Sequence, residues 1–251
     1  MTYLEFLILF LLIPLSFLVY FFYTSNLPNK RDFLFGTTAL AIIAFVYTTP
    51  WDNYLVMNNV WSYGIDRVQG VIGYVPIEEY CFFILQTYFT GLFCYRMQSF
   101  ASVLKKKDDN IYKKRYLVTF LYVLIFVMGV SSLFFETSFY LGLILVWSMP
   151  IIIFQWFVGS RYLVANKKLL FISTSIPTVY LWVADTIAIN LNIWQINSKY
   201  ILGISLAGLP FEEATFFMVT NLMLTQGLIL FVAMKDDLLK IYKNRKRSIF
   251  K

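Results

Sequence analysis

Long apolar stretches separated by short polar segments dominate the chain. A helix of about 20 apolar residues is long enough to span the hydrocarbon core of a bilayer. The second stretch is short, and its helix has room to continue past Pro50. The pattern predicts an all-α membrane protein with seven transmembrane helices. The seven stretches cover residues 4–23, 33–49, 77–95, 116–135, 139–158, 169–190 and 210–234.

Composition supports this class. Of the 251 residues, 59% are hydrophobic and only 14% are charged, which is too little charge for the surface of a soluble protein of this length. The first apolar stretch follows no basic segment and contains no clear small-residue cleavage site. It is therefore interpreted as a retained transmembrane helix rather than a signal peptide.

Positive charge is distributed unequally between the two sides of the predicted bundle. When the loops are assigned alternately to two sides, 19 of the 21 Lys and Arg residues fall on one side, and only Arg67 and Lys199 fall on the other. The positive-inside rule places the basic side in the cytoplasm. We therefore expect a multi-pass protein of the cell membrane with its N-terminus outside and its C-terminus cytoplasmic. The net charge of +7 reflects this orientation, and the basic tail IYKNRKR is expected to contact anionic lipid rather than nucleic acid.

Two segments share one unusual pattern. VPIEEYCFF at residues 75–83 and LPFEEATFF at residues 209–217 both read Pro-x-Glu-Glu-x-x-Phe-Phe, and each begins an apolar stretch. The likeness extends upstream, where an aspartate precedes a tryptophan by nine residues in each half. The corresponding pairs are Pro14 and Pro150, Asp52 and Asp185, and Pro76 and Pro210, with offsets of 136, 133 and 134 residues.

Such a steady offset indicates an internal duplication. The predicted helices 1–3 correspond to helices 5–7, with helix 4 as a connector. Corresponding helices are four spans apart and run in the same direction, so we expect two parallel three-helix repeats related by a pseudo-twofold axis along the membrane normal. The expected organisation is a first repeat at 1–97, a basic linker with span 4 at 98–138, a second repeat at 139–235, and a basic tail at 236–251.

Six acidic residues gather on the side with almost no basic residues. A proline and acidic residues in the first turn also suit any helix N-terminus, which would explain either motif alone. It explains neither the duplication nor Asp185, which lies within a predicted span, where an aspartate costs about 2.5–3.5 kcal/mol. Acids inside a membrane indicate function. The candidate catalytic residues are Asp52, Glu78, Glu79, Asp185, Glu212 and Glu213.

The two glutamates of each motif have different expected directions. Adjacent helix residues differ by about 100° in direction, so one glutamate is expected to point into the bundle while the other supports it. Glu79 and Glu213 share a helix face with the phenylalanine pair that follows each of them. Two carboxyl groups in a poorly solvated site favour a form in which one keeps its proton and acts as an acid.

Aromatic residues make up 20% of the chain. Aromatic belts and lipid-facing phenylalanines are ordinary in membrane proteins, but rings beside an acid also stabilise a carbocation. The chain has no histidine, which disfavours zinc and haem, so no metal site is expected. The candidate substrate-binding residues are Trp51, Trp61, Phe82, Phe83, Trp194, Phe216 and Phe217.

In these motifs the sequence resembles the integral-membrane lycopene cyclases. The segments that carry the resemblance are PWDNYLVMNNVW, GYVPIEEYCFF, VADTIAINLNIW and GLPFEEATFFMVTN, in that order. The resemblance implies cyclisation of the open ψ-ends of lycopene to β-ionone rings, giving γ-carotene and then β-carotene. It implies lycopene and related carotenoids as ligands, membrane lipid as surroundings, and Asp52 and Asp185 as groups that set the protonation of the glutamates or take the ring proton.

The reaction is an isomerisation without electron transfer, and the chain lacks the Gly-x-Gly-x-x-Gly fingerprint of dinucleotide binding. No cofactor is therefore expected. A proton- or cation-coupled transporter remains an alternative, because small transporters also contain parallel repeats and intramembrane acids. A cyclase for C50 or monocyclic carotenoids is also left open. A retinal photoreceptor is disfavoured, since residues 210–234 contain no lysine for a Schiff base.

Overall fold

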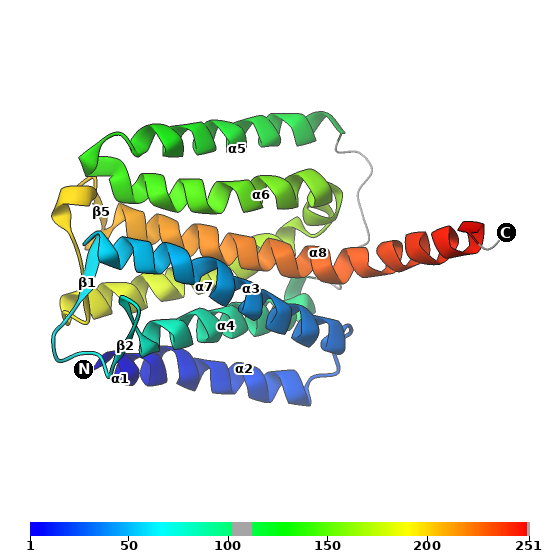
Figure 1. Ribbon diagram of the computed structural model, residues 1–251. Helices are drawn as coiled ribbons and strands as arrows, with labels where there is room; N and C mark the ends of the chain where they lie inside the picture. Colours follow the sequence, from blue (N-terminus) through cyan, green and yellow to red (C-terminus); the bar gives the residue numbers. More distant parts are fainter. Residues whose placement is uncertain (102–111, 250–251) are drawn as a thin grey trace.

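The computed structural model describes the backbone of residues 1–101 and 112–249 and shows a bundle of long helices (Figure 1). Most of the basic linker, at 102–111, lies outside the described residues, as do Phe250, Lys251 and the side chains of 112–114 and 236–249. The long helices are α1 (Tyr3–Leu7), which continues through a π-helical turn (Ile8–Leu12) into α2 (Ile13–Thr24), α3 (Lys30–Met57), α4 (Ile77–Ala101), α5 (Tyr112–Ser132), α6 (Phe139–Ala165), α7 (Lys167–Asn190) and α8 (Phe211–Ile249).

Six helical segments of the described chain are long and apolar enough to cross a membrane. They are Tyr3–Thr24, Lys30–Met57, Arg115–Ser132, Glu136–Ala165, Lys167–Asn190 and Phe211–Lys235. The protein is therefore a mostly helical, multi-pass membrane protein. Helix α4 is not among these six, although its 25 residues lie inside the bundle between α2, α3 and α7. Its two glutamates and its buried glutamines and threonines lower its hydropathy.

Prolines mark where the observed helices differ from the sequence-based expectations. The expected second span ended before Pro50, but α3 runs through Pro50 to Met57, so Asp52 lies inside a helix rather than after it. Helices α6 and α7 likewise contain Pro150 and Pro177. Inside membrane helices, neighbouring groups satisfy the carbonyl that a proline leaves free. Helix α8 continues without a break from the expected seventh span into the basic tail.

Short strands collect at one end of the bundle, where the N-terminus also lies (Figure 1). Each half contributes one three-residue strand and one hairpin of two-residue strands. The strands are β1 (Trp61–Tyr63), β2 (Val71–Ile72), β3 (Val75–Pro76), β4 (Trp194–Ile196), β5 (Ser205–Leu206) and β6 (Leu209–Pro210). Short 3₁₀ turns, η3 (Glu136–Ser138) and η4 (Ser198–Tyr200), lie beside each other in the second half.

Strands β1 and β4 join the two halves of the chain. They pair antiparallel with Ser62 opposite Gln195 at the centre. The flanking hydrogen bonds are reciprocal: the Gly64 amide donates to the Ile193 carbonyl at 3.0 Å, and the Asn197 amide donates to the Val60 carbonyl at 2.9 Å. The two bonds therefore exchange corresponding positions of the duplicated sequence.

Helices on the two sides of this strand pair are packed unequally. Helix α8 contacts α3, α4, α6 and α7 and forms the centre of the bundle, whereas α5 packs mainly on α6 at its edge (Figure 1). Only 6% of the apolar window of α5 is buried, against 61% in α8. The connector is thus peripheral, and the interior between α4 and α8 holds the site.

Candidate active site

A small cavity lies among the helix ends nearest the strands. Its volume is about 40 Å³, which is close to the space of one water molecule. Three carboxyl side chains line it, from Glu79 on α4, Asp185 on α7 and Glu213 on α8. The other lining residues are Tyr3, Trp61, Tyr63, Phe82, Trp194, Ile196, Phe216 and Phe217. Both halves of the chain therefore contribute acids and rings to one cavity.

Tyrosines from the N-terminal turns of neighbouring helices hold the two cavity glutamates. The Tyr3 hydroxyl donates to Oε2 of Glu79 at 2.5 Å, and the Tyr140 hydroxyl donates to Oε1 of Glu213 at 2.7 Å. Within the described part of the chain, no hydrogen bond reaches Oε1 of Glu79 or Oε2 of Glu213. Each glutamate thus has one oxygen fixed and one available to a ligand.

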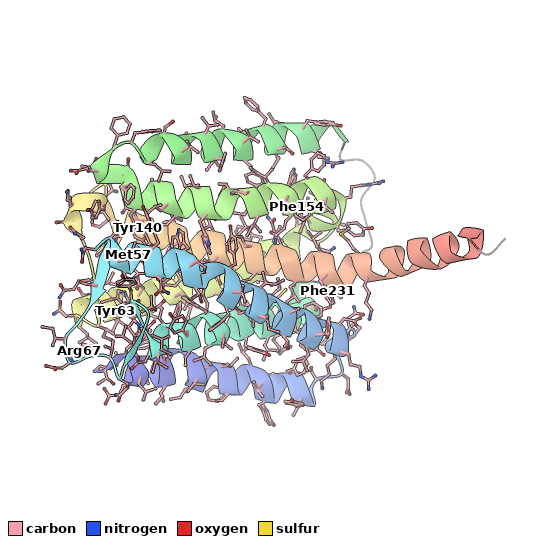
Figure 2. The ribbon with its side chains drawn as sticks, in the orientation of Figure 1. Met57, Tyr63, Arg67, Tyr140, Phe154 and Phe231 are labelled. Carbon is pink, nitrogen blue, oxygen red and sulfur yellow. The ribbon has the colours of Figure 1, made fainter. Side chains whose placement is uncertain are left out.

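Tyr63 adds a second donor on the first glutamate. Its hydroxyl donates to Oε2 of Glu79 at 3.1 Å, and its ring stacks on Tyr3 at 6.1 Å. Desolvation raises the pKa of the Tyr63 phenol well above its usual range, and the Glu79 carboxylate raises this pKa further. Tyr63 therefore keeps its proton and remains a hydrogen-bond donor. Figure 2 shows Tyr63 and Tyr140 at the end of the bundle that carries the strands.

The other glutamate of each motif faces the preceding loop. Oε1 of Glu78 accepts from the Gln69 amide at 2.8 Å, and Oε1 of Glu212 accepts from the Leu202 amide at 2.8 Å. Neither residue lines the cavity. Each carboxyl fixes the loop that leads into its own helix, so the structure separates the two members of each pair as the 100° rotation predicts.

The two aspartates differ in their surroundings, although both are buried. Oδ1 of Asp185 accepts from Nε1 of Trp194 at 2.8 Å, and Oδ2 has no partner in the described chain. Both oxygens of Asp52 are buried without a partner in the described chain, and so is Nε1 of Trp61. Asp52 is not among the residues that line the cavity. The duplication therefore preserves the residues but not the hydrogen bond.

The seven candidate aromatic residues fall into two groups. Trp61, Phe82, Trp194, Phe216 and Phe217 line the acidic cavity. Phe83 and Trp51 do not. Phe83 faces a larger apolar cavity, while Trp51 lies behind the site and stacks on Trp147 at 4.7 Å and on Phe216 at 5.8 Å.

Sequence reasoning missed the three tyrosines. Tyr3 and Tyr140 lie in corresponding turns, 11 and 10 residues before Pro14 and Pro150. Their spacing carried a usable signal, because the same offset relates the glutamates that they contact. Tyr63 has no such counterpart, since its position in the second strand is Ile196.

Comparison with known proteins places the chain in a family. The sequence profile of the lycopene cyclase family matches residues 1–97 and 134–232, two segments whose starts have the same offset as Asp52 and Asp185. The lycopene beta-cyclase of Halobacterium salinarum strain R1 is 39% identical over 198 residues, which are 78% of this chain and 81% of that protein. No solved structure matches.

Fungal proteins are also similar. The bifunctional lycopene cyclase/phytoene synthase of Aspergillus oryzae is 36% identical over 197 residues, which cover 76% of this chain but 33% of that protein. The site and the fold define a multi-pass membrane protein with an acid cluster inside a duplicated helix bundle. The chain belongs to the lycopene cyclase family.

Proposed function

We propose that this protein is a lycopene beta-cyclase in which Glu79 and Glu213 act on the substrate as acid and base. The observation that supports the proposal is their convergence, with Asp185, on one small cavity walled by aromatic rings. Two carboxyl groups in such a cavity repel each other if both are charged. Sharing one proton supplies an acid and a base together.

The proposed chemistry balances without an electron acceptor. The protonated glutamate donates its proton to the terminal double bond of the ψ-end and leaves a tertiary carbocation. A nearby double bond attacks this cation, which closes the six-membered ring and moves the positive charge onto a ring carbon. A carboxylate then removes a ring proton and forms the ring double bond. The product is an isomer of the substrate, and the protein regains its proton.

The rings around the cavity stabilise the cation and exclude water. An aromatic face contributes up to about 2 kcal/mol to a desolvated cation, and Phe82, Phe216 and Phe217 lie between the two glutamates along α4 and α8. Water in the cavity would trap the cation as an alcohol, so a dry site determines the product. Trp61 and Trp194 close the cavity on the strand side.

The remaining candidates receive supporting roles in this proposal. Glu78 and Glu212 position the cavity glutamates by fixing the loops at the helix starts. Asp185, which lines the cavity, is an alternative acceptor of the ring proton, and Asp52 acts from behind the site. The bundle is proposed to contain seven spans, counting α4, in two parallel repeats. The strand end is proposed to face outward, in agreement with the scarcity of basic residues there.

Pigment chromatography of lycopene-accumulating cells tests the proposal. The wild-type protein is expected to convert lycopene to β-carotene. E79Q and E213Q are expected to lower the rate by roughly 10²–10⁴-fold, the usual contribution of a general acid or base. Lycopene left unchanged by a correctly inserted wild-type protein would contradict the function and favour a transporter. Wild-type rates in both variants would contradict the assignment of residues. A single-ring or C50 product would change the substrate or product but keep the chemistry.

A further inference from the structure

A second cavity, larger and more apolar, lies next to the acidic one. Its volume is about 270 Å³, and it lies between α3 and α6 with α4 and α8 as its floor. Figure 1 shows α8 running between these two helices. Ile43 on α3 and Phe154 on α6 form part of the rim and are 57% and 67% exposed. In a membrane-embedded bundle, such an apolar rim opens towards the acyl chains.

One ring separates the two cavities. Phe216 lines both of them, and the neighbouring residues Phe82 and Phe83 on α4 face the acidic cavity and the larger cavity, respectively. The Phe216 ring lies parallel to Trp51 within 5° and to Trp147 within 26°. This flat stack forms the partition between the acids and the apolar space.

The sizes of the cavities exclude the acidic cavity as the whole binding site. About 40 Å³ holds no more than a water-sized group, whereas pockets for small organic ligands measure about 300–1,000 Å³. The end of a polyene must therefore displace Phe216 and occupy both spaces. Figure 2 shows Phe154 far along α6 from Tyr140, so the larger cavity leads away from the acids along the bundle.

From this continuity, and resting on the function proposed above, we infer that the α3–α6 cavity takes the polyene chain of the substrate directly from the bilayer, while Phe216 moves aside to admit the ψ-end to Glu79 and Glu213. The occupant is an extended, apolar, conjugated hydrocarbon. The flat stack of Trp51, Trp147 and Phe216 suits a planar chain, and the open rim admits a molecule longer than the cavity.

The repeat provides a matched control position. Tyr47 donates to the Trp147 carbonyl at 2.9 Å beside the cavity, and Tyr180 makes the corresponding bond to the Phe10 carbonyl at 2.9 Å in the other half. There the Phe89 ring packs on Tyr180 at 5.3 Å, whereas Met223, the counterpart of Phe89, lines the cavity. Ile176 on α7 corresponds to Ile43 and is 51% exposed.

The test compares I43W with I176W, with both changes also made in the inactive double variant E79Q/E213Q. Lycopene that purifies with the inactive protein is measured per polypeptide from its absorption, and cyclisation is measured in the active background. I43W is expected to lower bound lycopene about tenfold and to raise KM with little change in kcat, because an indole at the rim fills the entrance. I176W is expected to stay within about twofold of its parent, since it lies on the other side of the bundle.

Each outcome decides one point. If wild-type protein cyclises lycopene but I43W and I176W behave alike, the inferred binding site is wrong and the proposed function stands. If added phospholipid displaces the bound lycopene from the inactive protein, the cavity is an acyl-chain site and the inference fails. Loss of cyclisation in the wild-type protein itself would overturn the proposed function instead. Folding of I43W is checked independently by its elution as a single species from gel filtration in detergent.

Discussion

At the scale of single residues, the site is built from carboxyl groups whose second partners differ. Glu79 and Glu213 each bind a tyrosine hydroxyl, Glu78 and Glu212 each bind a backbone amide, and Asp185 binds an indole. A buried carboxylate without such a donor is costly, so these contacts decide which oxygen faces the cavity. Substitutions that remove only the donor therefore test position rather than charge.

The tyrosine donors offer the first such test. Y3F and Y140F each remove one hydroxyl from a buried carboxylate, and we expect each to destabilise the protein by about 1.5–3 kcal/mol, the range for hydrogen bonds to charged groups. Cyclisation should slow in both, because the glutamate loses its fixed orientation. Thermal unfolding in detergent and initial rates measure the two effects. Y20F, at a side chain 65% exposed on α2, serves as the control, and equal behaviour of all three would refute the role.

The two tryptophans give a second pair. W194F removes the donor to Asp185, whereas W61F removes an indole nitrogen that has no partner in the described chain. Both substitutions remove the same ring volume, so the difference isolates the hydrogen bond. We expect W194F to lower the free energy of unfolding by about 1.5–3 kcal/mol more than W61F. A larger loss in W61F would show that this contact does not hold Asp185.

At the scale of elements, each glutamate motif joins a loop to a helix. The Ile77 amide donates to the Gly70 carbonyl at 3.0 Å, and the Phe211 amide donates to the Ile204 carbonyl at 2.9 Å, so both hairpins return the chain to a helix start in the same way. Gly73 and Ala207 take corresponding positive φ values of 69° and 51° in these turns. The loops are thus built to hold the first turns of α4 and α8, where the cavity glutamates lie.

Limited proteolysis tests this connection. E78A removes the acceptor for the Gln69 amide, so we expect faster trypsin cleavage at nearby Arg67, while E212A should instead expose Lys199. Opening of a loop that loses one buried hydrogen bond is favoured by about 1–3 kcal/mol, or roughly 5- to 150-fold. Each variant is the control for the other. Identical fragment patterns from the two variants would contradict the local role of each glutamate.

Prediction from sequence reached the elements and the acids but not their partners. Apolar length found α3, α5, α6, α7 and α8 because membrane spans need continuous hydropathy. The exact end of α3 was missed, since a proline that ends a helix in water is tolerated when neighbouring helices satisfy its carbonyl. Contacts between distant residues, such as Tyr3 with Glu79, leave no local pattern and become visible only once the helices are packed.

At the scale of the whole molecule, two halves share one site. Glu79 comes from the first half, Glu213 from the second, and the strand pair β1–β4 crosses between them. Helix α8 of the second half also packs on α3 and α4 of the first. The interface is therefore extensive and does not depend on the covalent link between α4 and α5.

Dividing the chain tests this independence. Residues 1–106 and 107–251, produced as separate polypeptides in the same cells, are expected to assemble and to keep cyclisation within roughly tenfold of the intact protein. N197P removes one of the two amides that flank the strand pair. It should harm the divided protein far more than the intact one, because a covalent link raises the effective concentration of the halves. Equal losses in both formats would show that the strand pair does not drive assembly.

The reciprocal pairing of β1 with β4 has a consequence for how such a protein arises. A strand that pairs antiparallel with its own equivalent is self-complementary, so a polypeptide with a single copy would form an isologous dimer through that edge. Three crossings leave the end of one copy on the opposite face of the bilayer from its beginning. Joining two copies in tandem then demands one additional crossing, and the peripheral, little-buried α5 supplies it.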